Sequence, residues 1–471
     1  MYCFNPFLSH INGYIGLSNN LKSLFYISMF INLNVQMIYI VRLYTVFEGR
    51  TAMAYMDGIT CICDNGRTLE DHRPIVGDDV ISGIYRKAAS LQGKRVLHVN
   101  STYQSGGVAE MILSLVPLMN DVGIETQWNI LNGEGDFFVI TKNFHNALQG
   151  QAVAFSDEEK DLYLRTNESF SGKMTIDHDL VVIHDPQPLP LIRFYQKAQP
   201  WVWRCHVDLS NPDMDLWEFL KGFVLDYDRM VISHEGYRRR GMPMEQWICR
   251  PAIDPLSEKN RDLSSREIAG LLAKYGVPTD KPLVTQISRF DKWKDPEGVI
   301  DVFSEVKRHV DCRLVLCGSM APDDPEGWAI YRRVEEAARA FIDAGDVILI
   351  TAEDHLLVNA LQRASAVILQ KSLREGFGLT VTEGLWKGRP VIASRVGGIP
   401  LQIEDGETGF LLDPTDTDGF AWRVRQVLEN PELGKRLGQA GREHVRQHFL
   451  ITRLLSDYLD MLTAELVGRN T

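Results

Sequence analysis

The chain has 471 residues, which is too long for a single ordinary hydrophobic core and predicts two or three domains. Its apolar content of 45% and charged content of 24% are typical of a soluble globular protein. Because 62 acidic residues outnumber 50 basic ones, for a net charge of −12, the composition argues against a general nucleic-acid-binding protein. Dispersed cysteines in or beside strand-like segments predict buried reduced thiols and a cytoplasmic location: Cys205, Cys249, Cys312 and Cys317.

The first 55 residues differ in character from the rest of the chain. Nineteen uncharged, mostly apolar positions separate Lys22 from Arg42, which is close to the length of a membrane span. Amide side chains interrupt this run at a cost inside a bilayer, and no small-residue cleavage signature follows it. We interpret residues 1–55 as an atypical, non-native or mis-assigned extension, with Met53 or Met56 as alternative starts. A membrane tether is the competing interpretation.

From about residue 94, short apolar runs alternate with helical periods, as in open, mostly parallel α/β sheets. The N-terminal half predicts helices over 108–119 and 214–224 and strands over 95–99, 180–183, 201–203 and 230–232. The C-terminal half predicts strands over 283–287, 314–316, 347–350, 367–369 and 391–392, and a turn and edge strand over 406–412. The expected organisation is an N-terminal domain (56–254), a linker region (255–281), a C-terminal domain (282–444) and a C-terminal helix (445–471).

A glycine pair, Gly106 and Gly107, stands between the first predicted strand and the first predicted helix. Backbone amides at such a helix start can face a phosphate or a sugar. The segment 101–108 matches neither G-x-G-x-x-G nor a P-loop, which argues against nicotinamide-dependent and simple nucleotide-hydrolysing enzymes. A plain turn is the structural alternative, but the position opposite the C-terminal motifs favours binding.

Two polar residues follow predicted strands of the N-terminal half. Asp185 comes after strand 180–183, and His206 comes after strand 201–203. As structural alternatives, Asp185 would cap the turn before Pro186, and His206 would be a satisfied structural histidine.

The predicted strand 283–287 runs into a loop that carries Arg289 and Lys294. Loops of this kind leave a parallel sheet at the carboxyl ends of its strands, where ligands bind. Arg289 can grip a phosphate with two hydrogen bonds, and Lys294 supplies a compact point charge. A solvated basic loop is the alternative.

The segment 374–383 is the most informative part of the chain. Glu375 follows a buried strand, and Glu383 lies about one turn inside a short helix. The glycines between them let consecutive amides point at an anion. A carboxylate, an amide nest and a second carboxylate suit a sugar, a diphosphate and a ribose in a row. The intervening turn consists of Gly376, Phe377, Gly378 and Leu379.

Together, segments 288–294 and 374–383 resemble the donor site of retaining glycosyltransferases with the GT-B fold. That fold has two Rossmann-like domains facing a central cleft and a C-terminal helix that crosses back. The similarity covers roughly residues 94–465. Four further phrases resemble trehalose synthases of the glycosyltransferring kind, which join the glucose of a nucleoside diphosphate glucose to free glucose: His145–Gly150, His184–Pro188, Trp203–Ser210 and Asp323–Trp328.

The resemblance implies roles for these residues. Arg289, Lys294 and the amides of residues 376–379 would stabilise the departing diphosphate, an electrostatic role like that of an oxyanion hole. Glu375 would bind donor hydroxyls and Glu383 the ribose, with the glycine pair and Phe377 completing the donor site. The catalytic set would add His206, beside the 6-hydroxyl of the donor sugar, and Asp185, holding the acceptor sugar.

The resemblance also implies same-face transfer, in which a donor phosphate oxygen takes the acceptor proton. No tightly bound cofactor or metal is expected, nucleoside diphosphate glucose being a co-substrate and Mg²⁺ at most a stimulant. A homodimer is implied, and no nucleic-acid or membrane partner is expected. Four D-x-D triplets match the metal motif of other glycosyltransferases only superficially, at 177–179, 213–215, 226–228 and 416–418.

Two kinds of alternative stay open. The acceptor could be a sugar phosphate, fructose or a glycan. A phosphorylated acceptor needs another basic cluster, for which Arg238–Arg240 is the candidate, with a solvated loop as its other interpretation. The second alternative is a non-catalytic nucleotide-sugar sensor. The base of the nucleotide is not indicated.

Overall fold

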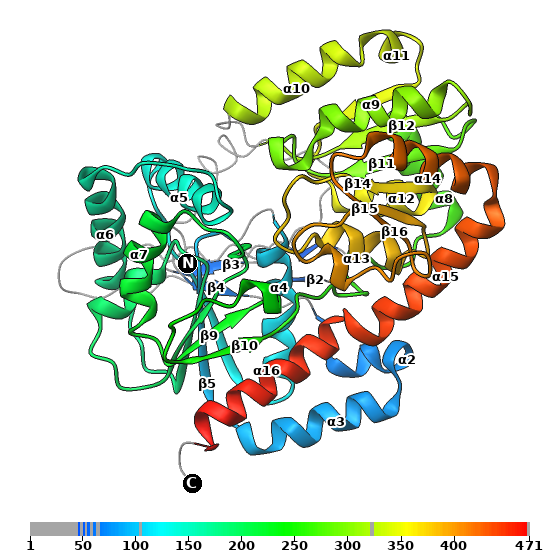
Figure 1. Ribbon diagram of the computed structural model, residues 1–471. Coiled ribbons are helices and arrows are strands. Elements are labelled where there is room, and N and C mark those ends of the chain that lie inside the picture. The colour runs from blue at the N-terminus through cyan, green and yellow to red at the C-terminus, as the bar shows by residue number, and fades with distance from the viewer. Residues whose placement is uncertain are drawn as a thin grey trace, which may run out of the picture.

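The computed structural model describes residues 46–47, 50–51, 54–56, 60–62, 66–102, 106–320 and 325–468. Most of the predicted extension 1–55, residues 103–105 of the glycine segment and residues 323–324 of the last resembling phrase lie outside the described residues. Two α/β units lie side by side, and each is built around one large sheet (Figure 1). Both sheets are built on parallel strands, as predicted.

The N-terminal unit contains an eight-stranded sheet in the order β10-β9-β8-β7-β5-β6-β4-β3. Six of its strands are parallel: β5 (Arg95–Asn100), β6 (Glu125–Ile130), β7 (Leu180–His184), β8 (Trp201–Arg204), β9 (Arg229–Ile232) and β10 (Glu245–Ile248). The remaining two strands, β4 (Thr60–Ile62) beside β6 and β3 (Ala54–Met56) at the edge, are joined by antiparallel pairing. A separate pair is formed by β1 (Val46–Phe47) and β2 (Arg50–Thr51).

The C-terminal unit contains a six-stranded sheet in the order β13-β12-β11-β14-β15-β16. All its pairs are parallel. The strands are β11 (Leu283–Ile287), β12 (Arg313–Cys317), β13 (Val347–Ile350), β14 (Ser365–Gln370), β15 (Val391–Ser394) and β16 (Phe410–Leu412). The predicted strands of both halves are confirmed, and β16 occupies an edge as expected.

Helices cover both faces of each sheet. They are α2 (Arg73–Val76), α3 (Asp78–Ala88), α4 (Gly107–Asp121), α5 (Gly135–Leu148), α6 (Asp157–Ser171), α7 (Met214–Val224), α8 (Ser265–Lys274), α9 (Pro296–Lys307), α10 (Pro325–Ala337), α11 (Arg339–Asp343), α12 (His355–Ala364), α13 (Leu379–Trp386), α14 (Thr417–Glu429), α15 (Pro431–His448) and α16 (Ile451–Leu466). Short 3-10 helices are η1 (Leu69–His72), η2 (Ala89–Leu91), η3 (Leu189–Phe194), η4 (Glu235–Tyr237), η5 (Lys292–Lys294) and η6 (Ile399–Leu401).

The cores follow from strands that are buried on both faces. Every residue of β7 is buried, between a cluster on the side of α5, α6 and α7 and another on the side of α3, α4 and α16. In the second unit, α9 and α14 pack on one face, while α8 and α12 pack on the other. The range 255–281, predicted as a linker region, contains helix α8, and Leu272 of that helix packs in the core of the C-terminal unit. The four expected thiols are free and buried: Cys205, Cys249, Cys312 and Cys317.

The C-terminal helix crosses back to the first unit. After α15 ends at His448, α16 lies along α3 and α4, and Figure 1 shows it passing under the N-terminal sheet. Its apolar face enters the N-terminal core through Leu454, Leu455 and Leu459. Among the described residues, none of the helices is both long and apolar enough to span a bilayer.

Strand order decides where ligands can bind. In the second sheet β11 lies between β12 and β14, so the order along the chain reverses beside it. In the first sheet β5 occupies the same position, between β6 and β7. Loops that leave the carboxyl ends of the strands at such reversal points form the usual ligand crevice of open α/β sheets. The predicted site residues follow these strands.

Glu465 and Asp460 of α16 provide a matched test of the crossing helix. Arg229 Nε lies 2.5 Å from Glu465 Oε1, and both side chains are under a tenth exposed, whereas the pair Asp460–Lys87 is about two-fifths exposed. We expect Glu465→Ala to lower the thermal midpoint by roughly 2–4 °C, because the guanidinium of Arg229 loses its buried partner and keeps only the more exposed Glu245, 2.6 Å away. Asp460→Ala should change it by less than about 1 °C. Equal shifts in the two variants, measured by calorimetry, would contradict this view of α16.

Candidate active site

The predicted donor motifs meet the predicted N-terminal residues where the two units touch. A Cβ atom on Gly376 would lie 2.9 Å from the carbonyl oxygen of His206. A Cβ atom on Gly107 would lie 2.7 Å from Cδ1 of Leu379. A side chain at Gly376 would meet backbone and push the units apart, so glycine is required there, whereas the end of the Leu379 side chain could move away from a side chain at Gly107. The structure therefore brings the two glycine segments to opposite sides of one interface.

Lys294 and Glu375 form a direct ion pair at the reversal point of the second sheet. Their side chains are mostly buried, and Gln370 Nε2 and Ser372 Oγ each lie 3.4 Å from the paired carboxylate oxygen. Buried Gln286 joins the two loops, because its Nε2 donates to the carbonyl of Lys294 at 2.9 Å and its Oε1 accepts from the amide of Lys371 at 3.0 Å. The cation and the carboxylate are thus held by both strands.

Arg289 lies on the same loop but is more open. Its side chain is 63% exposed, and its Nη2 lies 3.6 Å from Asp291 Oδ2. Asp291 also caps η5 by accepting from the amide of Trp293 at 2.8 Å. The guanidinium is therefore accessible to an anionic ligand, whereas Lys294 is already paired.

The turn before α13 is fixed by two residues of other loops. Tyr237 Oη donates to the carbonyl oxygen of Gly376 at 2.6 Å. A Cβ atom on Gly397 would overlap the carbonyl oxygen of Glu375. Gly378 has a φ of 83° and is the N-cap of α13, which begins at Leu379 and is the predicted short helix. The first amides of a helix have no acceptor in the preceding turn. Here the amide of Val381 donates to the carbonyl of Gly378 at 2.9 Å, so Leu379 and Thr380 carry the amides that can face an anion.

Glu383 is buried and engaged by protein donors. Lys259 Nζ lies 3.3 Å from Glu383 Oε1, and Gln362 Nε2 donates to Oε2 at 3.1 Å. The same ammonium lies 2.9 Å from Glu110 on α4 of the first unit. Burial lowers the pKa of Lys259, but the charges of Glu383 and Glu110 outweigh it and raise that pKa above its usual value. Lys259 therefore links the two units through charge, a function that its polar surroundings in the sequence did not indicate.

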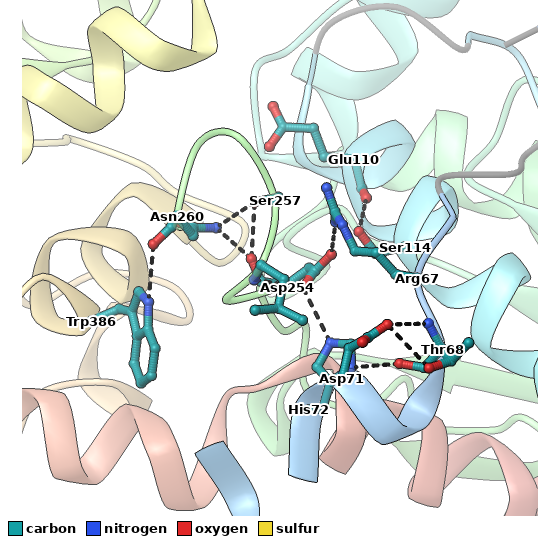
Figure 2. Close-up of polar contacts among 11 residues, drawn as sticks. Arg67, Thr68, Asp71, His72, Glu110, Ser114, Asp254, Ser257, Asn260 and Trp386 are labelled. Atoms are coloured by element: carbon teal, nitrogen blue, oxygen red, sulfur yellow. Dashed lines mark hydrogen bonds and ion pairs between the residues drawn. The ribbon is translucent and has the colours of Figure 1, made fainter. Parts of the chain in front are cut away.

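The segment that carries Lys259 is tied at both ends (Figure 2). Asp254 pairs with Arg67 and lies 3.3 Å from Nε2 of His72, both from the start of the first unit. Burial would raise the pKa of Asp254, but the hydrogen bond with His72 and the charge of Arg67 hold it below its usual value. At the other end, the carbonyl of Asn260 accepts from Trp386 Nε1 of α13 at 3.3 Å.

Asp185 and His206 lie together at the ends of neighbouring strands. Asp185 has a φ of 62°, a left-handed conformation that aspartate and asparagine tolerate better than most residues. Its Oδ1 accepts from the backbone amide of His206 at 2.7 Å, so it caps the adjacent strand and not its own turn. Burial raises the pKa of this carboxyl, against the opposing effects of His145 and the amide of His206.

The segment 145–151 makes further contacts between the units. Asn146 Oδ1 accepts from Trp293 Nε1 at 3.3 Å, and Lys292 Nζ lies 3.0 Å from Gln151 Oε1. A Cβ atom on Gly150 would lie 2.7 Å from Nη1 of Arg374. Segment 145–150, one of the phrases that carry the resemblance, therefore helps to hold the two units together.

Each D-x-D triplet contains an aspartate with a structural partner. Asp213 and Asp416 cap α7 and α14, while Asp179 and Asp228 accept from backbone amides at strand starts. In the part of the chain that the structure describes, no group of three or more His, Cys, Asp or Glu side chains is arranged to hold a metal ion.

Two family descriptions match the chain. "Trehalose synthase, N-terminal domain" matches residues 98–239, and "Glycosyl transferases group 1" matches residues 270–444. The trehalose synthase of Thermococcus litoralis is 44% identical over 410 residues, which cover 86% of this chain and 99% of that protein. The trehalose synthase of Rubrobacter xylanophilus is 42% identical over 411 residues, covering 85% and 98%.

Solved structures support the fold. An α,α-trehalose-phosphate synthase from Burkholderia xenovorans, in complex with glucose-6-phosphate, matches with a TM-score of 0.66 at 12% identity, covering 79% of this chain and all of that one. Sucrose-phosphate synthase from Thermosynechococcus elongatus matches with a TM-score of 0.62 at 18% identity, covering 80% and 100%. These neighbours establish the GT-B architecture.

Gly397→Ala tests whether the loop geometry around Glu375 matters. The added methyl group would displace the backbone of Glu375, and Gly397 also has a φ of 52°. We expect at least about a tenfold loss of catalytic activity together with a lowered thermal midpoint. Gly406→Ala is the control, because its φ is 83° but no atom lies within 4 Å of the added carbon. That variant should lose only about 1–2 kcal/mol of stability and keep its activity. Indistinguishable activities would contradict the assignment.

Proposed function

The chain belongs to the trehalose synthase family of glycosyltransferases, and we propose that it transfers glucose from a nucleoside diphosphate glucose to free glucose to form trehalose. The observation that carries this proposal is the contact between Gly376 and His206. It joins the loop of Lys294 and Glu375 to the segment of Asp185 and His206. A donor bound on the first loop would present its glucosyl group to an acceptor held by the second segment.

On the donor side, the diphosphate would meet the ammonium of Lys294, the guanidinium of Arg289 and the first amides of α13. Lys294 is already positioned by Glu375, so little reorganisation is needed when negative charge develops on the leaving group. Two side-chain cations suffice in this proposal without a tightly bound metal, and Mg²⁺ would act as a stimulant. Glu375 would then bind the donor hydroxyls, and Glu383, beside Lys259, the ribose.

The transfer would retain the anomeric configuration. The acceptor hydroxyl oxygen bonds to the anomeric carbon as the bond from that carbon to the diphosphate oxygen breaks. The hydroxyl proton passes to a donor phosphate oxygen on the same face. Glu375 and Glu383 are both paired with lysines on the donor side, which supports binding roles for them in this proposal.

The contacts of the arginine cluster favour free glucose over a sugar phosphate. Arg238 pairs with Glu235 and donates to the carbonyl of Gln246 at 2.6 Å. Arg239 donates to the carbonyl of Leu209 at 3.2 Å and lies over the ring of Trp217. Two of the three arginines in this cluster are thus already engaged by protein groups and less suited to binding a phosphate.

Product identification tests the proposal directly. The full chain would be incubated with ADP-, UDP- or GDP-glucose and, in turn, with glucose, glucose 6-phosphate and fructose. We expect trehalose from glucose, with the anomeric configuration determined by NMR. A phosphorylated or fructose-containing disaccharide would redirect the proposal to that acceptor, and nucleotide-sugar binding without product would indicate a sensor.

Lys294→Ala should reduce turnover roughly 100-fold or more, because the leaving diphosphate loses a positioned charge and Glu375 loses its partner. Steady-state rates with saturating glucose measure the effect. Lys274→Ala is the control, since that lysine is 62% exposed and lies on α8 beside Asp354. Wild-type turnover in Lys294→Ala would remove Lys294 from the donor site.

Asp185→Asn should raise the KM for glucose roughly 10- to 100-fold, which corresponds to one lost charged hydrogen bond. Asparagine tolerates the left-handed backbone and can still accept from the amide of His206. Because burial raises the pKa of Asp185, the wild-type KM should also rise as the pH falls towards that raised pKa and the carboxylate is protonated.

The variant has no such carboxylate, so its KM for glucose should vary less over this pH range. The affinity for the nucleotide sugar should be the same in the variant and in the wild-type protein. Weaker donor binding with an unaltered glucose dependence would place Asp185 outside the acceptor site.

A further inference from the structure

Three histidines form a continuous row across the N-terminal sheet, which the sequence analysis did not anticipate. His98 lies in β5, His184 ends β7 and His206 follows β8. Nδ1 of His98 is 2.9 Å from Nε2 of His184, and Nδ1 of His184 is 3.0 Å from Nε2 of His206. The rings stack in sequence, with centroids 5.2 Å and 5.3 Å apart. The row leads from the core to the proposed site.

Burial favours a neutral ring at each position of this row. His98 and His184 are completely buried, and burial lowers the pKa of His98 to about 3. Burial also lowers the pKa values of His184 and His206 well below the usual range, with a further decrease from the charge of Arg204. A neutral imidazole has one N–H donor and one bare nitrogen acceptor. Each nitrogen–nitrogen contact must therefore contain one hydrogen.

This requirement leaves two arrangements of protons. Either all three rings are protonated on Nδ1, or all three are protonated on Nε2. The second arrangement would place a hydrogen on Nε2 of His98, which is buried and has no hydrogen-bond partner among the described residues. A buried N–H without an acceptor is rare and costly.

The surroundings of His98 are short of acceptors and not of donors. The ring of Tyr458 lies 5.9 Å from that of His98, and its hydroxyl can donate or accept. That hydroxyl also interacts with the guanidinium of the buried Arg204, which can only donate, so the oxygen suits Arg204 and the hydrogen is left for His98. A bare Nε2 on His98 suits this environment, so the geometry favours protonation on Nδ1 throughout.

We propose that His98 and His184 are positioning residues that hold His206 as a neutral imidazole with its hydrogen on Nδ1. Nε2 of His206 is occupied by His184, so Nδ1 is the ring nitrogen left to donate to a ligand. The inference rests on the proposed function, in which that ligand is the glucosyl group of the donor. Its partner would be a sugar hydroxyl oxygen.

Neutrality has a chemical reason in this reaction. Glycosyl transfer passes through an oxocarbenium-like state in which positive charge develops on the sugar ring. An imidazolium beside the ring would oppose that charge, whereas a neutral N–H can orient a hydroxyl without opposing it. The buried row prevents His206 from taking a second proton.

His184→Phe is the first test, because it keeps a stacked aromatic ring and removes both nitrogens. We expect kcat to fall about tenfold or more and the KM for the nucleotide sugar to rise, while affinity for the free nucleoside diphosphate stays unchanged. His98→Phe should shift both constants in the same direction by a smaller factor. His178→Phe is the matched control. His178 is also buried, but it lies just before the amino end of β7, at the other end of the strand from His184, so its replacement should leave both constants unchanged.

A purely structural role would lower stability in all three variants without this separation of constants, and that result would overturn the proposal. The second test needs no variant of His184 or His98 to fold. Spectra of the full chain labelled with ¹⁵N-histidine, with His206 assigned through His206→Gln, should show the Nδ1–H tautomer at neutral pH. An Nε2–H tautomer or an imidazolium at His206 would refute the inference.

The two tests separate this inference from the proposed function. The spectrum reports the tautomer whether or not glucose is the acceptor. Conversely, trehalose formation by a protein whose His206 carries the other tautomer would leave the proposed function intact and remove only the positioning role.

Discussion

One mostly buried ammonium holds the two halves of the site together. Lys259 lies between Glu110 of the first unit and Glu383 of the second, with Nζ–Oε1 distances of 2.9 Å and 3.3 Å. A buried lysine without carboxylate partners is strongly unfavourable, and here the partners belong to different units. The burial of this charge therefore requires the units to be in contact, and the approach of Gly376 to His206 is part of the same arrangement. The ties of Asp254 and Asn260 fix the segment in place (Figure 2).

This arrangement gives the interface a chemical consequence. Under the proposed function, a ribose that reaches Glu383 would meet a carboxylate already neutralised by Lys259, and Lys259 is shared with the other unit. Any ligand that alters the pairing of Glu383 therefore alters a contact between the units. Nucleotide binding and the approach of Asp185 and His206 would be coupled through one charge, because linkage between two sites is reciprocal.

Much of this fold was predictable because parallel strands buried on both faces appear as continuous apolar runs, as β7 and β11 do. Lys294 and Glu375 could be placed together because both follow strands at a reversal point. The strands β6 and β10 were not predicted, since polar residues interrupt both. Lys259 was also missed, because its partner Glu110 is 149 residues away and a lone lysine in a polar segment indicates solvent.

The histidine row shows why such residues are hard to predict from the sequence. His98 lies among the apolar residues Val96, Leu97 and Val99, and its partner His184 is 86 residues away. Among the described residues, Nε2 of the buried His98 has no hydrogen-bond partner, which costs stability and makes a purely structural explanation unattractive. Tyr458, which lies behind this row, comes from α16, the helix that crosses over from the second unit. The crossing helix therefore covers the N-terminal sheet and also completes the polar core that orients His206 towards the donor loop.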